Sequence, residues 1–139
     1  MLGYKAIEAH IVGLIQGAVD DAETVKSYGG EFSPDSFGQV PLRYPAVFVN
    51  IQGLSSEMQS NTGSVELEIF IHVASHDLSG EQEARHGVYD IMEQVRDAVN
   101  QQAVPDKGML KLESEDVIGY SKVMQTCVMR GIYRLKAQT

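Results

Sequence analysis

The histidines are the side chains of this chain that could most readily form a chemical site. His72 and His76 are four residues apart in a stretch that alternates polar and apolar residues, so on a β-strand both lie on one face. With Asp77 and His86 nearby in the sequence, these are residue types that could hold a zinc ion. On a continued strand, however, Asp77 points away from His76, and no HExxH spacing occurs. Surface histidines are the preferred interpretation, and we predict no metal site.

The single cysteine is the second candidate. Cys127 could act as a nucleophile together with a distant histidine. It lies in a strand-like stretch among Val123, Met129 and Tyr133, which favours a buried, unreactive thiol. One cysteine also excludes an internal disulfide.

A pair of glutamates is the third candidate for a chemical site. Glu66 and Glu68 share one face of a predicted strand, with side chains about 7 Å apart, and such a pair could do acid–base work. A solvated sheet surface or a subunit contact is the more usual role. The Gly29-Gly30 pair lacks the lysine and the strand–turn–helix setting of a phosphate-binding loop. We therefore predict no catalytic residue and no cofactor, and a protein that is not an enzyme.

Hydrophobic periodicity predicts the elements that must position these residues. Apolar residues at spacings of three and four predict two helices, Leu2–Val19 and Ser79–Gln101, the second opened by a capping box of Ser79 and Gln82. Period-two alternation predicts strands over Ala46–Gly53, Ser64–Ser75 and Lys122–Lys136, a short strand at Leu110 and Leu112, a turn over Val117–Tyr120, and an extra strand near Val25–Tyr28. In the last long strand, one face is predicted to carry Val123, Cys127, Met129, Tyr133 and Leu135.

This order, α-β-β-α-β-β, predicts an α+β fold. We expect a two-layer sandwich in which two helices pack on one face of a mainly antiparallel sheet of four to five strands. The length of 139 residues predicts a single domain over residues 1–139. The strands before and after the polar loop Leu54–Gly63 are expected to form an antiparallel hairpin.

Charge and hydropathy narrow the classes of partner. The net charge is −8, with 11 basic and 19 acidic residues, which argues against a nucleic-acid-binding surface. The longest apolar run in the first helix, Ile11–Ile15, is far shorter than a membrane span. No export signal is evident, so we expect a chain that is made and kept in the cytoplasm and has no membrane partner.

A long arm, residues 27–45, interrupts the regular pattern. It reads SYGGEFSPDSFGQVPLRYP, and its glycines and prolines predict a loop. Its large apolar side chains must either fold back on their own domain or dock on another chain, and the sequence leaves both alternatives open. The candidate subunit-interface residues are Phe32, Phe37, Leu42, Arg43 and Tyr44.

Four segments together resemble a known family. They are RYPAVFVNIQG at residues 43–53, ELEIFIHVASHD at 66–77, GVYDIMEQVRDAV at 87–99 and SKVMQTCVMRGIYRL at 121–135. The pattern resembles the small tail proteins of Mu-like phages and prophages, which are similar in architecture to the tail terminators of long-tailed phages. The resemblance covers nearly the whole chain and rests on the order of elements, with no invariant chemical motif.

The resemblance implies a structural role. It implies a homo-oligomeric ring, commonly a hexamer, that caps the tail tube, ends tube and sheath polymerisation and offers a head-docking surface. The implied partners are further copies of the chain, the tail tube and sheath proteins and the head–tail connector, and the implied location is the virion tail, assembled in the bacterial cytoplasm. Two alternatives remain: another neck, head–tail connector or tail-completion protein, and a small metal- or ligand-binding domain that uses the histidines and the Glu66/Glu68 face.

The polar loop Leu54–Gly63 is the remaining candidate site. Both of its ends are anchored by the two best-predicted strands, and it is longer than a minimal hairpin turn. We expect it to face the tail tube or channel through Ser56, Glu57, Met58, Gln59 and Asn61.

Overall fold

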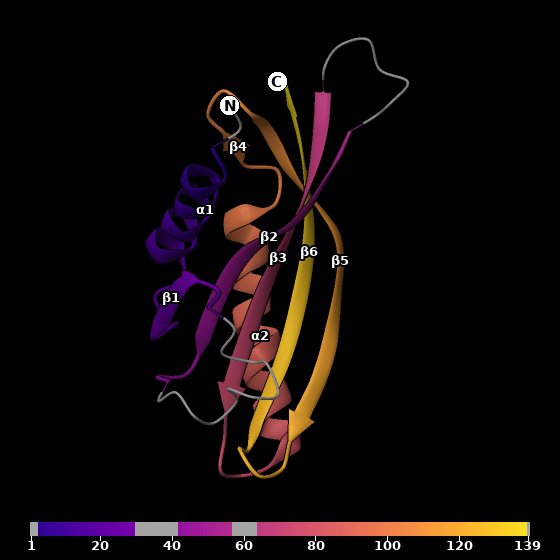
Figure 1. The fold of residues 1–139 in the computed structure, drawn as a ribbon. Coiled ribbons are helices and arrows are strands. Elements are labelled where there is room, and N and C mark those ends of the chain that lie inside the picture. Colours follow the sequence, from indigo (N-terminus) through magenta and orange to yellow (C-terminus); the bar gives the residue numbers. More distant parts are fainter. Residues whose placement is uncertain (1–2, 30–41, 57–63, 139) are drawn as a thin grey trace.

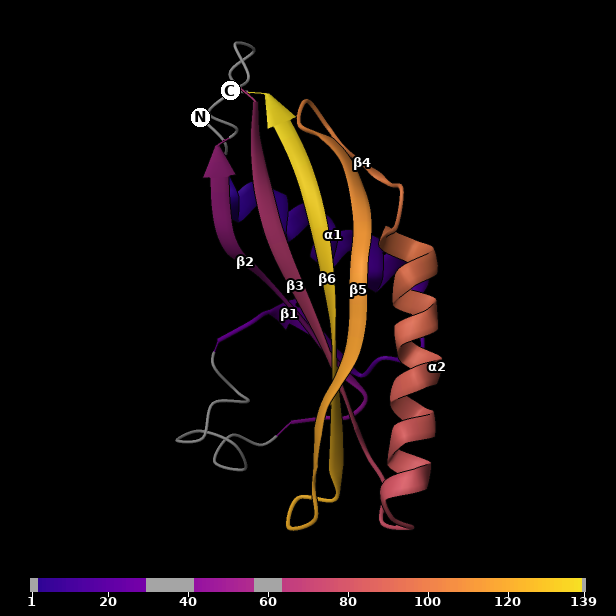
Figure 2. The same cartoon turned by 90° about the vertical axis from the view of Figure 1, so that its right-hand side faces the viewer.

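Two helices cover one face of a curled, six-stranded sheet (Figures 1 and 2). The structure, a computed structural model, describes residues 3–29, 42–56 and 64–138. The elements are α1 (Tyr4–Ala18), β1 (Thr24–Ser27), β2 (Ala46–Ser56), β3 (Ser64–His76), α2 (Glu81–Val99), β4 (Ala103–Val104), β5 (Gly108–Ser121) and β6 (Thr126–Gln138). The predicted α+β class is confirmed.

The sheet is larger than predicted and mixed in direction. Its strand order is β1-β2-β3-β6-β5-β4. β1 runs parallel to β2, and every other pair is antiparallel. The expected four to five antiparallel strands and the order α-β-β-α-β-β are therefore corrected to six strands in the order α-β-β-β-α-β-β-β. The extra strand expected near Val25–Tyr28 is confirmed as β1.

The core lies between the helices and the sheet, as periodicity predicts. The alternating residues of β3, the predicted stripe of α2 and the isoleucines of α1 are buried in one cluster. β2 and β3 form the predicted antiparallel hairpin, with Ile51 opposite Ile69. The pairing continues to Ser56, which lies opposite Val65, so Leu54, Ser55 and Ser56 belong to β2 and not to a loop.

β5 corrects two predictions. It is one strand of 14 residues, so the strand expected at Leu110 and Leu112 is confirmed but is longer than predicted, and the turn expected over Val117–Tyr120 was wrong. The pairing of β5 with β6 shifts register between Leu112 and Ser114 and again between Val117 and Gly119. Each irregularity adds a residue and breaks the period-two alternation, so the pattern looked like a strand followed by a turn.

The ends of α2 and β6 differ from prediction as well. α2 begins after Gly80, which caps it without a side-chain hydrogen bond, so the capping box of Ser79 and Gln82 does not form. Instead, the Ser79 amide donates to Asp77 Oδ1 at 2.8 Å. β6 begins at Thr126, and Val123 in the preceding turn is 92% exposed, so its predicted place in the last strand, on one face with Cys127 and Tyr133, was wrong.

Candidate interaction surfaces

The end of the arm is folded onto its own domain. The Tyr44 ring stacks on His76 at 5.8 Å between ring centroids, and the Thr24 hydroxyl donates to the Arg43 carbonyl oxygen at 2.8 Å. Burial raises the pKa of Tyr44, with a hydrogen bond to Thr126 opposing the shift. At Tyr44 the fold-back alternative therefore holds, while the Arg43 side chain is exposed and Leu42 is half-buried. Phe32 and Phe37 lie outside the described residues.

The loop candidates lie mostly outside the described part of the chain. Glu57, Met58, Gln59 and Asn61 fall in the segment 57–63, which the structure does not describe. Ser56 is the last residue of β2, so its expected place in a loop is corrected to a strand end.

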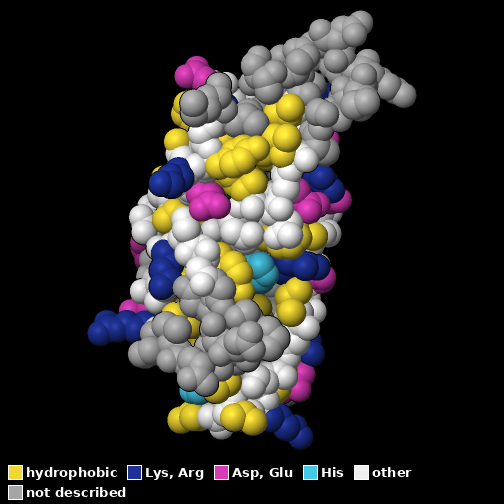
Figure 3. Space-filling model, viewed as in Figure 1, with side chains coloured by type: hydrophobic (Ala, Val, Ile, Leu, Met, Phe, Trp, Pro, Cys, Tyr) yellow, Lys and Arg dark blue, Asp and Glu magenta, His cyan; other side chains and the backbone are white. Residues whose placement is uncertain are grey.

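The sheet face opposite the helices, here called the open face, carries a polar and aromatic row. Phe48, His72, Arg130 and Asp116 are in register across four strands. The Tyr28 ring stacks on His72 at 5.2 Å, and the Arg130 guanidinium both donates to Asp116 Oδ2 at 3.2 Å and lies 4.9 Å from the ring centre of Phe70. Figure 3 looks onto this face, where charged and apolar side chains alternate. The row connects side chains from four strands, and Phe48 within it is fully buried.

Arg134 gathers three carboxylates at the upper end of the open face. It pairs with Glu68 at 2.9 Å, with Glu66 at 3.8 Å and with Glu113. The hydrogen bond from Arg134 lowers the pKa of Glu113. Glu66 and Glu68 share one face as predicted, and their ion pairs with Arg134 agree with a surface or contact role. The sequence could not reveal the third carboxylate, since Glu113 lies where β5 changes register.

Two exposed apolar side chains mark one end of the molecule, here called the tip. Leu78 is 76% exposed in the β3–α2 loop, and Val123 is 92% exposed in the β5–β6 turn. The Asp77 amide donates to the Gln125 carbonyl oxygen at 3.0 Å, so a backbone hydrogen bond joins the two loops. Figure 1 places the turn between β5 and β6 at the lower end of the molecule, and Figure 3, in the same view, shows apolar side chains at that end. Large contiguous apolar patches are typical of contact surfaces, whereas single exposed apolar side chains are common on protein surfaces.

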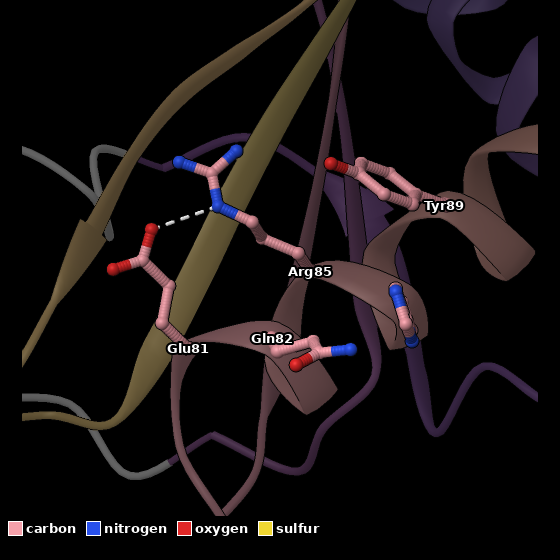
Figure 4. A pocket seen from close by; sticks show the side chains of 5 residues that line it. Glu81, Gln82, Arg85 and Tyr89 are labelled. Carbon is pink, nitrogen blue, oxygen red and sulfur yellow. Dashed lines mark hydrogen bonds and ion pairs between the residues drawn. The ribbon is translucent and has the colours of Figure 1, made fainter.

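A shallow hollow lies along the first turns of α2 (Figure 4). Its volume is about 340 Å³, and it is lined by Glu81, Gln82, Arg85, His86 and Tyr89. Arg85 Nε donates to Glu81 at 2.8 Å, and Figure 4 shows the Tyr89 hydroxyl directed toward Arg85. The bonds to Glu81 and Tyr89 raise the pKa of Arg85. Because every lining residue comes from one helix, the hollow forms an open groove in the helix surface.

The histidines and Cys127 lie in separate surroundings. His72 and His76 lie on β3, each stacked on a different tyrosine, and His86 lies on α2 in the other layer. Within residues 3–29, 42–56 and 64–138, no three histidine, cysteine or acidic side chains are grouped closely enough to hold a metal ion. Cys127 is buried as predicted, and that burial raises the pKa of its thiol.

We expect His72 to make stability depend on pH. Burial and the nearby Arg130 lower the pKa of His72, with Asp116 opposing. The unfolded chain then binds the proton more readily, so stability falls as the pH drops below the unfolded value of about 6.5. Melting temperatures measured from pH 7.5 to 5.5 should fall less steeply for His72→Gln than for the parent. The control is His86→Gln, at an exposed position on α2, which should keep the parent's slope. Parallel curves for parent and His72→Gln would contradict the assignment.

Comparison of the sequence with known proteins identifies the family to which this chain belongs. No curated protein matches the sequence. None of the helices in the described residues is long and apolar enough to cross a membrane. The profile of the family described as Bacteriophage Mu, Gp37 matches residues 4–128, from the start of α1 into the beginning of β6. The resemblance to Mu-like phage proteins is thereby confirmed, and the chain belongs to the bacteriophage Mu Gp37 family.

Proposed function

We propose that this protein is a structural component of a phage or prophage tail, and specifically the subunit of a tail terminator ring. The observation that carries the proposal is the family match over residues 4–128, which places the chain among Mu-type phage proteins. In this role the ring, a hexamer, caps the tail tube, ends tube and sheath polymerisation and offers the surface on which the head docks. Its partners are its own copies, the tube and sheath proteins and the head–tail connector.

The surfaces support a structural role. The side chains that could act as an acid, a base or a nucleophile are engaged in packing or ion pairing. Glu66 and Glu68 pair with Arg134, and Cys127 lies in the core. Leu78 and Val123 are exposed in the β3–α2 loop and the β5–β6 turn, two connections at the same end of the molecule (Figure 1), where they are available for a contact with another subunit. These features support assembly more than catalysis.

Removing the gene from a phage or inducible prophage tests the proposal. We expect tails of uncontrolled length without heads, because nothing stops tube growth and the docking surface is missing. Tail lengths are measured by electron microscopy of negatively stained lysates. Complementation with the parent chain should restore a single tail length, and an empty vector provides the control.

The same micrographs separate the terminator from the alternative neck or connector role. A head–tail connector acts after the tail is complete, so its loss would leave tails of normal length beside unattached heads. That outcome would overturn the terminator assignment while keeping a role in tail completion. Infectious particles of normal length would overturn both roles.

A further inference from the structure

β5 presents a free strand edge over most of its length. On the side away from β6, β4 pairs only with the first two residues of β5. The next outward backbone bonds are those of Leu110 with residues 101 and 102, and that of the Leu112 amide with Asn100 Oδ1. From residue 113 to residue 121, the described part of the chain supplies no hydrogen-bond partner for the outer edge. This stretch can therefore pair with a further strand.

β1 presents a second free edge, and Figure 1 shows β1 and β5 on opposite sides of the sheet. The Tyr28 amide, just after β1, donates to the Val49 carbonyl oxygen of β2 at 2.8 Å. Because successive residues of a strand direct their backbone groups to opposite sides, Val25 and Ser27 direct theirs outward. The Val25 carbonyl oxygen accepts from Gln16 Nε2 at 3.1 Å, an exposed side-chain contact on this outer side.

The two edges lie at the same level of the sheet. The strand pairing can be followed from β1 through β2, β3 and β6 to β5, row by row. The rows join Val25 to Val117, Lys26 to Asp116 and Ser27 to Glu115. Copies of the chain related by a rotation about an axis parallel to the strands would therefore bring these residues side by side.

The backbone groups on the two edges match as well. Leu112, Glu115 and Val117 lie opposite every second residue of β6, and the Leu112 amide is directed outward. Because alternate pairs of an antiparallel ladder have the same orientation, Glu115 and Val117 also direct their backbone groups outward. The outward residues of β1 on the same two rows are Ser27 and Val25. β5 runs opposite to β1, so facing residues could exchange backbone hydrogen bonds as in an antiparallel ladder.

From these matches we infer that β5 of one copy pairs with β1 of the next, so that the sheet continues from subunit to subunit. The inference rests on the proposed ring and names its subunit contact. Val117 exchanges two backbone hydrogen bonds with Val25 of the next copy, which replaces the Gln16 side chain there. Addition of a strand to a sheet edge is a common mode of recognition. Because the two edges differ, the contact is heterologous, and with a suitable rotation it closes into a ring.

A second β5 is the alternative occupant of the β5 edge. Such a pair would bring together the carboxylates of two copies, which are Glu113, Glu115 and Asp116 in each. Like charges on facing strands are destabilising. β1 carries no carboxylate, and its Lys26 falls on the row of Asp116. The charges on the two strands therefore favour β1.

Disulfide trapping tests the contact. In the inferred register, Lys26 and Asp116 of adjacent copies form a non-hydrogen-bonded pair with Cα atoms about 4.5 Å apart, which a disulfide can span. On mild oxidation, Lys26→Cys/Asp116→Cys should give a ladder of covalent oligomers on a non-reducing gel, ending in a closed ring. Within one copy the two positions lie four strand spacings apart, roughly 19 Å along the sheet, so they do not join each other. The native Cys127 is buried.

The control variants use the same strands. Lys26→Cys and Asp116→Cys alone should stay monomeric on the gel, because each lacks its partner. Lys26→Cys/Lys111→Cys is the matched double control, since Lys111 is exposed on the same face of β5 but four β6 residues away from the level of Asp116, about 13 Å. It should form no ladder. Melting temperatures under reducing conditions confirm that each variant is folded.

Three outcomes would overturn the inference. They are a Lys26→Cys/Asp116→Cys variant that stays monomeric on oxidation, a Lys111 control that forms the same ladder, and dimers from Asp116→Cys alone, which would show that β5 pairs with β5. None of them decides the terminator role, which the tail lengths after gene removal judge separately. Conversely, tails of normal length together with the disulfide ladder would keep the contact and refute the terminator.

Discussion

Ile69→Asp should leave the protein unfolded at room temperature. Ile69 is fully buried on the core face of β3, which is paired with β2 and with β6. A carboxylate there would have no partner, and burying it costs several kcal/mol against a total stability of about 5–15 kcal/mol. Circular dichroism and thermal melting of the purified variant measure the loss.

The neighbouring residue provides a matched control. Glu68 lies on the open face and pairs with Arg134 at 2.9 Å. Because exposed ion pairs contribute little, and Arg134 keeps Glu66 and Glu113, Glu68→Gln should cost no more than about 1 kcal/mol. If Ile69→Asp melts with the parent, or both variants unfold alike, the two faces of β3 are assigned wrongly.

The features that could be predicted from the sequence are those set by local periodicity. β3 alternates without interruption from Val65 to Val73, and its core face follows directly. The stripes of α1 and α2 follow from spacings of three and four in the same way. The β2–β3 hairpin could be predicted because its strands are neighbours in the chain.

The features that were missed depend on contacts between distant segments. β5 breaks its alternation twice, so only its pairing with β6 defines it as one strand. β1 pairs in parallel with β2, and no local pattern encodes that pairing. Val123 fits the alternation of β6, but the chain turns before Thr126 and leaves it exposed.

The interaction surfaces also combine features set by local periodicity with features set by contacts between distant segments. The shared face of Glu66 and Glu68 could be predicted, but their common partner Arg134 comes from β6 and needs the register of the sheet.

Gly108→Ala should destabilise the protein by about 3 kcal/mol, which lowers the melting temperature by roughly 10 °C. Gly108 begins β5 with φ at 145°, a conformation that residues with a side chain rarely adopt. A Cβ there would lie 2.2 Å from the Lys136 carbonyl oxygen of β6. Because the obstacle is backbone at a paired strand, relief requires moving β5 away from β6.

Gly119→Ala, on the same strand, is the control for the close approach of Gly108 to the backbone of β6. No atom lies within 4 Å of a Cβ built on Gly119, and its φ lies outside the left-handed range. Alanine there should change stability by no more than about 0.5 kcal/mol, as surface substitutions usually do. Thermal and urea unfolding of both variants gives the comparison. Equal stability of the two variants would show that β5 and β6 are not in close contact at Gly108, and a large loss in both would point to a general requirement for glycine along β5. The predicted difference arises because the bare Cα of Gly108 lets β5 start against the end of β6, which fixes the upper edge of the open face where Lys111 and Arg134 lie side by side.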